Sequence, residues 1–319
     1  MKLKVEELKT RLDKYLAEQL KDISRSQIQR DIEAGSVLVN GRKVLESKFV
    51  VRSQDKIEYH PSTKESTKSA AAQIVLKVLY DNHGLLIIDK PAGLTVHPGA
   101  GFKGETLASA LLYQFRDIKL VGEEGRSGIV HRLDKDTSGV ILVAKTQEMY
   151  EYLKDAFADR KVKKEYIALV SGKVERSYGF IETPIGRSKT DFRKYDTRNI
   201  IEPKESVTEY KVLEYLNNPD ASLNKASHLD CYTLIMVRLH TGRTHQIRVH
   251  MKSLGHPLVG DELYGLKKAG LPALNRQFLH ARKIEVRLPN GTWIEAESEL
   301  PQDLKKVLVE LGSKRLAQI

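Results

Sequence analysis

A stretch of polar residues divides this chain of 319 residues into two parts of different character. Residues 61–73 are rich in Ser, Thr, Lys and Ala and have no apolar periodicity. Such a composition is typical of a linker, because it offers no apolar face that could be buried. The sequence therefore predicts a small domain over residues 1–60, a linker over residues 61–73 and a larger domain over residues 74–319.

Residues 1–60 have the pattern of a compact helix–helix–hairpin module. Leu12, Leu16 and Leu20 recur at every fourth position, as residues on one face of a helix do. A second helix is predicted to begin near residue 24 or 26 and to end near Gly35. Residues 37–39 are predicted to form a strand that leads into a tight Asn40-Gly41 turn. Further strand patterns follow near residues 49–51 and 57–59.

Residues 74–319 predict a mixed α+β domain. Strand patterns outnumber helix patterns and do not alternate strictly with them, so a largely antiparallel sheet is favoured over a doubly wound one. The predicted strands cover residues 74–80, 85–89, 139–144, 165–171, 207–213, 232–239 and 283–287. The predicted helices cover residues 105–115, 147–157 and 244–254, and a short terminal helix is predicted near residues 303–311.

The charge of the chain favours a polyanionic partner. Lys and Arg number 53 against 42 Asp and Glu, which gives a formal net charge of +11. Nucleic acid is the commonest partner of a protein this basic.

The single cysteine and the lengths of the apolar runs indicate the compartment. Cys231 cannot form an internal disulfide or a thiolate metal cage, so a role as core filler in a reducing compartment is predicted. The N-terminal residues lack the apolar segment of a signal peptide, and the apolar runs are too short to span a bilayer. We therefore expect a cytoplasmic protein with no membrane partner.

Polar residues gather between Gly128 and Gly139, between two apolar strand patterns. The segment presents two carboxylates, Asp134 and Asp136, among basic residues. A loop held between rigid strands is a usual place for a catalytic side chain. Most charged loops are plain surface turns, however, and the residues by themselves leave both interpretations open.

Three further segments could contribute to a site. Residues 90–101 contain two prolines and three glycines and are predicted to form a rigid turn. Residues 161–170 are a basic run that leads into a strand containing Tyr166. Residues 240–250 follow a strand pattern and are predicted to open a helix with Thr244 as its N-cap, with Arg243 pointing toward the sheet edge.

The histidines of the last segment do not have the spacing of a metal site. His240, His245 and His250 recur at every fifth position, whereas a helical zinc pair has two histidines four residues apart. Buried, hydrogen-bonded histidines are therefore favoured. Because a phosphate-binding glycine motif is also missing, we predict catalysis without a metal or an organic cofactor.

Together these segments resemble the motifs of the RluA family of pseudouridine synthases. Residues 131–139 resemble the central motif, residues 90–98 the upstream motif and residues 241–250 the downstream motif. The likeness runs from about residue 75 to residue 291 and is nearest to the RluD-like branch, which acts on large-subunit ribosomal RNA. Residues 1–60 are similar to the S4-type RNA-binding domain, a small α/β domain that often precedes this catalytic core.

The resemblance implies roles for four residues. Asp134 is the implied catalytic aspartate, and Arg243 is the implied cation that pairs with it. Tyr166 would contact the target uracil, and Arg132 would help to expel the target base and fill its place. An ionised carboxylate can act as a nucleophile or as a stabiliser of a sugar intermediate, and the sequence leaves these two mechanisms open.

Two basic surfaces are candidates for RNA contact, one in each domain. The N-terminal candidates are Arg11, Lys14, Arg25, Arg30 and Arg42. The candidates in the catalytic domain are Arg187, Lys189, Arg193 and Lys194. The second set is interleaved with Phe192 and Tyr195, and basic with aromatic side chains can grip unpaired bases. A solvated hairpin tip is the alternative interpretation of this segment.

We therefore expect a monomeric RNA pseudouridine synthase whose substrate is large-subunit ribosomal RNA in the helix 69 region. Transfer RNA is the alternative substrate. A non-catalytic, ribosome-associated RNA-binding factor would share the charge and the S4-like domain but would not need Asp134, Arg243 and Tyr166 together. A metal hydrolase that uses Asp134 and Asp136 is disfavoured because the ligand spacing is missing.

Overall fold

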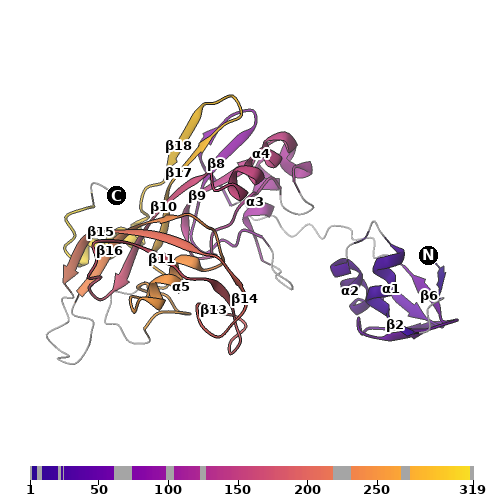
Figure 1. Cartoon of the computed structure of the whole chain (residues 1–319). Helices are drawn as coiled ribbons and strands as arrows, with labels where there is room; N and C mark the ends of the chain where they lie inside the picture. Colours follow the sequence, from indigo (N-terminus) through magenta and orange to yellow (C-terminus); the bar gives the residue numbers. More distant parts are fainter. Residues whose placement is uncertain are drawn as a thin grey trace. The chain divides into compact units, whose positions relative to one another are not determined.

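The chain divides into two compact units, residues 1–69 and residues 70–319 (Figure 1). The structure is a computed structural model, and it describes residues 2–5, 9–20, 23, 25–60, 74–97, 104–122, 127–217, 231–266 and 274–316. The predicted linker, residues 61–73, lies outside the described residues. Within the described ranges, no helix has the length and apolar character needed to cross a membrane.

The N-terminal unit packs two helices against short strands. The helices are α1 (Leu12–Gln19) and α2 (Arg25–Glu33). The strands are β1 (Lys2–Lys4), β2 (Lys9–Arg11), β3 (Val37–Val39), β4 (Arg42–Lys43), β5 (Val50–Arg52) and β6 (Lys56–Tyr59). One sheet has the order β1-β6-β3-β4, and β2 pairs with β5. The predicted helix–helix–hairpin order is confirmed.

Local residue choice explains this small fold. Leu12 and Leu16 of α1 are fully buried with Ile28 and Ile32 of α2, so the spacing of the apolar residues does mark the inner faces. The turn between β3 and β4 has positive φ at both Asn40 and Gly41, as a two-residue hairpin requires.

The larger unit is built on one nine-stranded sheet. Its order is β11-β15-β16-β10-β17-β9-β8-β7, with β18 also paired to β17. The bounds are β7 (Lys77–Asp81), β8 (Leu85–Lys90), β9 (Ser138–Ala144), β10 (Lys163–Ser171), β11 (Tyr178–Glu182), β15 (Val207–Asn217), β16 (Cys231–Leu239), β17 (Leu279–Arg287) and β18 (Trp293–Glu297). The strand pairs that the structure describes in this sheet are antiparallel except β9 with β17. The predicted α+β class with a largely antiparallel sheet is confirmed.

Helices and a second, smaller sheet surround this framework. The helices are α3 (Leu107–Gln114), α4 (Gln147–Ala158), α5 (Gln246–Ser253), α6 (Gln302–Glu310) and the 3-10 helix η1 (Arg116–Leu120). The smaller sheet has the order β13-β12-β14 and contains β12 (Ile185–Ser188), β13 (Tyr195–Asp196) and β14 (Ile200–Lys204). Residues 187–194, which carry the candidate RNA-contact side chains of this unit, therefore lie at the end of β12 and in the turn that joins β12 to β13.

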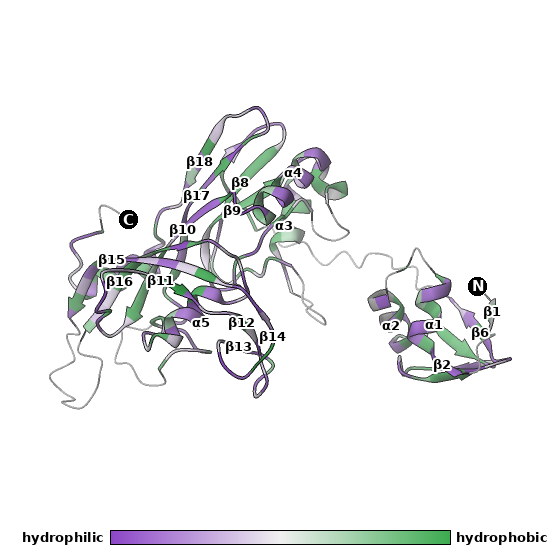
Figure 2. Ribbon diagram, in the orientation of Figure 1, coloured by the Kyte–Doolittle hydropathy of each residue, from purple (hydrophilic) through white to green (hydrophobic). Residues whose placement is uncertain are grey.

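The central strand β10 separates two cores. Tyr166, Ala168 and Val170 belong to the main core, whereas Ile167 and Leu169 pack in the core that contains α6. This division follows from the two-residue period of a strand, which sends successive side chains to opposite faces. Figure 2 shows the hydrophobic stretches of the sheet strands in green. The candidate catalytic residue Tyr166 therefore lies on the face opposite α6.

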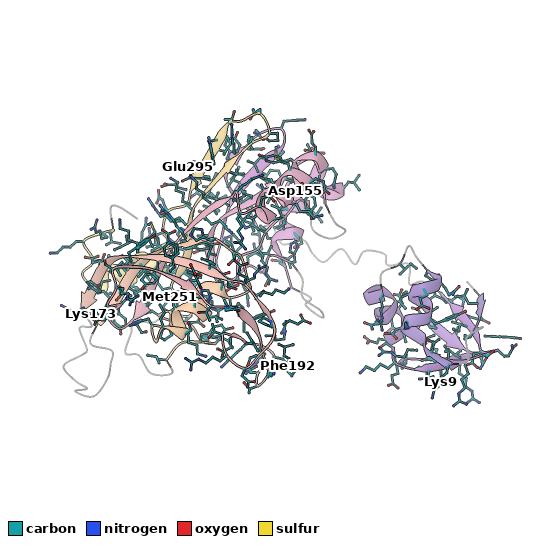
Figure 3. The ribbon with its side chains drawn as sticks, in the orientation of Figure 1. Lys9, Asp155, Lys173, Phe192, Met251 and Glu295 are labelled. Atoms are coloured by element: carbon teal, nitrogen blue, oxygen red, sulfur yellow. The ribbon has the colours of Figure 1, made fainter. Side chains whose placement is uncertain are left out.

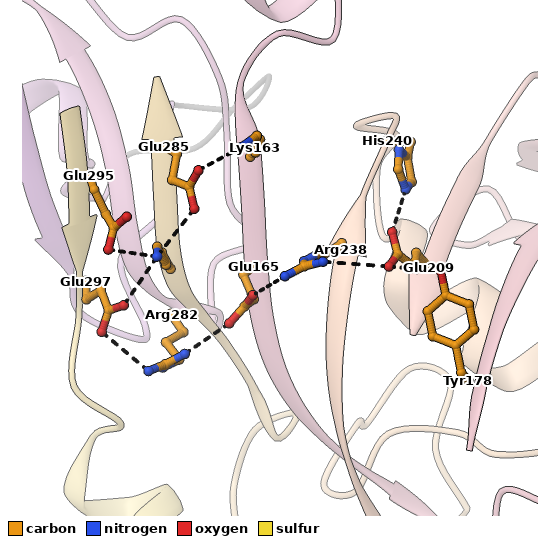
Figure 4. A network of polar contacts seen from close by, with 11 residues as sticks. Lys163, Glu165, Tyr178, Glu209, Arg238, His240, Arg282, Glu285, Glu295 and Glu297 are labelled. Atoms are coloured by element: carbon orange, nitrogen blue, oxygen red, sulfur yellow. Dashed lines mark hydrogen bonds and ion pairs between the residues drawn. The ribbon is translucent and has the colours of Figure 1, made fainter. Parts of the chain in front are cut away.

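A network of ion pairs crosses the sheet on the face that carries Ile167 (Figure 4). Glu165 of β10 contacts Arg282 of β17 at 3.0 Å and Arg238 of β16 at 3.4 Å, and Arg238 also contacts Glu209 of β15 at 3.9 Å. Because Glu165 precedes Ile167 by two residues, the same face is polar at this end and apolar beneath α6. The network therefore lies on the other face of β10 from Tyr166.

Candidate active site

Asp134 lies in the loop that precedes β9, and its cation is Arg248. Asp134 Oδ2 accepts a hydrogen bond from Arg248 Nη1 at 2.9 Å. Arg248 also donates from Nε and Nη2 to the two carboxylate oxygens of Asp261, at 2.6 and 2.9 Å. Its side chain is only 8% exposed. One buried guanidinium therefore binds two carboxylates and fixes the direction of Asp134.

The charge of Arg248 is stabilised by the same contacts. Burial by itself would lower the pKa of Arg248, but the hydrogen bonds and charges of Asp261 and Asp134 raise it above its ordinary value. The guanidinium therefore remains a permanent positive charge beside Asp134.

The prediction that Arg243 pairs with Asp134 is wrong. Arg243 is exposed, and its Nε donates to the backbone oxygen of Glu205 at 3.0 Å. Gln246 Oε1 accepts hydrogen bonds from the Thr241 hydroxyl and the Arg243 backbone N–H, which holds residues 241–243 in a turn ahead of α5. The partner of Asp134 is the arginine five residues further along the same motif.

Tyr166 lies on β10 within the electrostatic field of Asp134. Its side chain is buried, and burial followed by the negative charge of Asp134 raises the pKa of Tyr166. The hydroxyl therefore stays protonated at neutral pH. Arg132 is exposed two residues before Asp134, so a long cation stands at the rim of the same loop.

His245, for which the sequence predicted only a buried and hydrogen-bonded role, lies in the site beside Asp134. Its Nε2 lies 4.0 Å from Asp134 Oδ1, and its Nδ1 lies 2.9 Å from the Tyr264 hydroxyl. Tyr264 in turn packs its ring 5.0 Å from the Arg248 guanidinium. His245 has a left-handed backbone with φ 57° and is the N-cap of α5, so the predicted cap at Thr244 is wrong.

The loop that carries Asp134 is held by buried polar side chains. Lys90 Nζ donates to the carbonyl oxygens of Pro91, Leu94 and Lys135 at 2.8, 2.9 and 3.0 Å. Three acceptors match the three N–H donors of an ammonium group. Burial lowers the pKa of Lys90 to about 7, and the charges of Asp136 and Asp134 act in the opposite direction. Lys90 thus joins residues 90–94 to the catalytic loop.

A second buried cation binds the next residue of the same loop. Arg276 Nη1 donates to the backbone oxygen of Asp136 at 3.0 Å, and its Nε donates to Asp303 of α6 at 2.6 Å. Gly139 follows with φ 115°, where an added Cβ would lie 2.1 Å from the Ala281 oxygen on β17. A glycine is therefore required where β9 meets its parallel partner.

The histidines near the site have structural partners. His131 Nε2 accepts from the Leu142 backbone N–H at 2.8 Å, and burial followed by the charge of Lys164 lowers its pKa to about 3. His250 is buried between Thr208 and the Thr183 carbonyl, as predicted. His240 differs, because it is exposed and pairs with Glu209.

The predicted RNA-contact residues of the N-terminal unit have different surroundings. Arg11 and Arg25 bind the buried Asp13. Burial by itself would raise the pKa of Asp13, but the hydrogen bonds from Arg11, Gln29 and Arg25 together outweigh burial and lower this pKa to about 2. Lys14 and Arg42 are exposed. The side chain of Arg30 lies outside the described part of the chain.

The candidates beside the smaller sheet are also partly engaged. Arg187 stacks on Tyr195 at 5.0 Å and donates to the Phe192 carbonyl, and Arg193 pairs with Asp191. Lys189 is exposed and Lys194 is half-buried. Phe192, in the turn between β12 and β13, is 66% exposed and is labelled in Figure 3.

Comparison with known proteins identifies the class. Residues 84–253 match the family described as RNA pseudouridylate synthase, and residues 10–57 match the S4 domain. A solved structure of human RNA Pseudouridylate Synthase Domain Containing 1 is 26% identical, with a TM-score of 0.56 over 76% of this chain and 97% of that chain. The chain belongs to the RNA pseudouridine synthase family and carries an S4 domain.

Curated relatives that match nearly the whole chain indicate its branch within the family. An uncharacterized RNA pseudouridine synthase of Aquifex aeolicus is 36% identical over 96% of this chain and 95% of its own length. A ribosomal large subunit pseudouridine synthase D of Xanthomonas campestris is 38% identical over 97% of this chain and 92% of its own length. The predicted place in the RluD-like branch of the RluA family is confirmed.

Proposed function

We propose that this protein isomerises uridine to pseudouridine in large-subunit ribosomal RNA and that Asp134 is the catalytic carboxylate. The observation that carries the proposal is the buried Arg248, which holds the Asp134 carboxylate at 2.9 Å near the buried Tyr166. A charged surface turn would not need a buried partner that is itself fixed by Asp261.

The reaction suits these groups. The bond between uracil N1 and ribose C1′ breaks, the base turns over, C5 bonds to C1′, and the proton lost from C5 is balanced by one gained at N1. No electron carrier and no water is consumed. The Asp134 carboxylate can attack the substrate or balance positive charge at C1′. The ring of Tyr166 can stack on the uracil, and Arg132 can occupy the place of the flipped base.

The proposed substrate is the helix 69 region of large-subunit ribosomal RNA, modified by a monomer in the cytoplasm. Relatives named ribosomal large subunit pseudouridine synthase D support this choice. The S4 domain and the exposed Lys14, Arg42 and Lys189 are suited to a phosphate backbone. A non-catalytic RNA-binding factor is disfavoured, because it would not require the contact between Asp134 and Arg248.

The test is a map of pseudouridines, made by chemical labelling of ribosomal and transfer RNA from cells with and without the gene. We expect pseudouridines in helix 69 to disappear without the gene and to return with the wild-type protein but not with Asp134→Asn. If pseudouridines disappear only from transfer RNA, transfer RNA is the substrate and the proposal of ribosomal RNA is wrong. Unchanged maps of both RNAs would contradict the proposed activity.

A further inference from the structure

The hydrogen bond between Tyr264 and His245 determines which ring nitrogen of His245 carries a proton beside Asp134. The Tyr264 oxygen accepts a hydrogen bond from the Tyr195 backbone N–H at 2.9 Å. Its own hydrogen can then be donated to His245 Nδ1, which lies 2.9 Å away. In the opposite arrangement two N–H groups would point at one oxygen, and the hydroxyl hydrogen of the buried Tyr264 would lose this acceptor.

His245 is neutral in this arrangement. Burial lowers the pKa of His245, and the charges of Arg248 and Arg132 add to that effect, while Asp134 and Asp261 oppose it. A neutral imidazole that accepts at Nδ1 carries its proton on Nε2. The Nε2–H is therefore the ring atom that faces Asp134.

The Nε2–H has no hydrogen-bond partner close enough among the described residues. Asp134 Oδ1 lies 4.0 Å from Nε2, which exceeds hydrogen-bond length. The His245 side chain is 20% exposed. A substrate atom that enters between the carboxylate and the ring could therefore accept this hydrogen bond.

The backbone of His245 indicates that the ring position is maintained against strain. Its φ of 57° and ψ of 20° are uncommon for a residue with a side chain. Tyr195 and Tyr264 hold the ring edge-to-face, at centroid distances of 5.8 and 5.5 Å. Strained residues of this kind gather at sites where one geometry has to be kept.

We propose that His245 is a further catalytic residue, whose Nε2–H donates a hydrogen bond to a carbonyl oxygen of the detached uracil. This inference rests on the proposed function. When the N1–C1′ bond breaks, its electron pair leaves with the base, and the negative charge spreads over N1 and the two carbonyl oxygens. A fixed neutral donor stabilises that charge without giving up its proton. Asp134 meanwhile faces the positive charge at C1′, and Tyr264 is a positioning residue that acts through His245.

The test compares two variants at the same backbone position. His245→Asn suits a left-handed backbone and can still accept from Tyr264, but it lacks a donor at the Nε2 position. His245→Gln can reach that position with an N–H. We expect the single-turnover rate of pseudouridine formation to fall about 100-fold in His245→Asn, the usual effect of losing one such donor. We expect His245→Gln to be about tenfold faster than His245→Asn, with RNA affinity nearly unchanged in both variants.

A nitrogen-15 NMR measurement of the free protein reads the tautomer directly. We expect the Nε2–H form in the wild type and a mixture with the Nδ1–H form in Tyr264→Phe. A wild-type Nδ1–H tautomer, a wild-type rate in His245→Asn or equal losses in Asn and Gln would each overturn the role of His245. These outcomes leave the proposed function standing if wild-type protein still forms pseudouridine, whereas an inactive wild type would remove both.

Discussion

Two arginines of one motif differ in their role at the site: Arg248 binds Asp134, whereas Arg243 does not. Lysine in its place cannot bind both oxygens of Asp261 and also reach Asp134, because an ammonium is a point charge and not a planar fork. For Arg248→Lys we expect a fall of about 100-fold in the single-turnover rate. We also expect a loss of about 2 kcal/mol in the free energy of unfolding, since Asp261 is left poorly paired.

Arg243→Lys is the matched control in the same motif. Lysine can replace the hydrogen bond that the Arg243 side chain donates to the Glu205 carbonyl. We expect a rate within about threefold of wild type and a change in unfolding free energy below about 0.5 kcal/mol. If Arg243→Lys is as inactive as Arg248→Lys, the assignment of Arg248 in place of Arg243 as the partner of Asp134 is mistaken.

The sequence predicted the loop of Asp134 but not its partner, for a local reason. Arg243 and Arg248 occur in one motif, and the directions of their side chains depend on where α5 begins. That start is shifted to Gln246 by the left-handed backbone of His245, which residue type alone does not reveal. His245 itself was interpreted only through its five-residue spacing from two other histidines. A histidine directly before a helix, close to an expected catalytic loop, was the available signal.

At the scale of elements, Lys90 is the contact that joins two loops. Lys90→Met keeps the length of the side chain but leaves three carbonyl oxygens without their donor. We expect a loss of about 2 to 4 kcal/mol in unfolding free energy, measured in urea. Hydrogen exchange should become faster in residues 131–137, because the clamp on that loop is gone.

An exposed lysine provides the control for Lys90. Lys77 pairs with Asp89 at 3.3 Å on the surface of the same unit. Lys77→Met should change the unfolding free energy by less than about 1 kcal/mol, as exposed ion pairs contribute little. Similar losses in both variants would mean that Lys90 is not a special contact.

Elements with strong apolar patterns could be predicted, and short polar ones could not. β8 and β9 were found because their residues form continuous apolar runs that both faces of the sheet bury. β18 was missed because its other four positions are exposed or half-buried and Ala296 alone is buried. β12 to β14 were missed because their polar residues do not alternate regularly with apolar ones, and Glu202 has a positive φ inside β14.

At the scale of the whole molecule, buried histidines predict acid sensitivity. Burial lowers the pKa of His131, His245, His250 and His280 below the ordinary 6.5. As pH falls below 6.5 the unfolded chain takes up protons that the folded chain does not, so stability must fall with pH. Between pH 6.5 and about 5 most carboxylates do not yet titrate, which isolates this effect.

The measurement is urea unfolding followed by the fluorescence of Trp293, the single tryptophan. We expect the midpoint to fall steadily from pH 7 to pH 5. His131→Gln keeps an acceptor for the Leu142 N–H but cannot titrate, so its pH dependence should be shallower. If the midpoint does not change between pH 7 and pH 5, these histidines are not held buried and uncharged in the folded protein.

The division into two units predicts how RNA binding is shared. Deletion of residues 1–60 removes the S4 domain and its exposed basic side chains, including Lys14 and Arg42. We expect weaker RNA binding and a smaller dependence of Kd on salt, since fewer counterions are released. The rate at saturating RNA should change less than the affinity. Equal salt dependence in the full and truncated chains would contradict a separate RNA-binding role.

The central claim is that Asp134, and not the loop charge in general, performs the chemistry. Asp134 and Asp136 are two residues apart, but they are held differently. The carboxylate of Asp134 is bound by Arg248, whereas Asp136 presents its backbone oxygen to Arg276. The side chain of Asp136 can therefore change without disturbing that clamp.

The most direct measurement is tritium release from C5 of labelled uridine in substrate RNA, with RNA binding measured in parallel. Asp134→Asn keeps size and hydrogen-bonding capacity but removes the anion. We predict no detectable release with Asp134→Asn although RNA is still bound, and most of the wild-type rate with Asp136→Asn. Release by Asp134→Asn at a rate close to wild type, or equal losses in both variants, would contradict the assignment of Asp134.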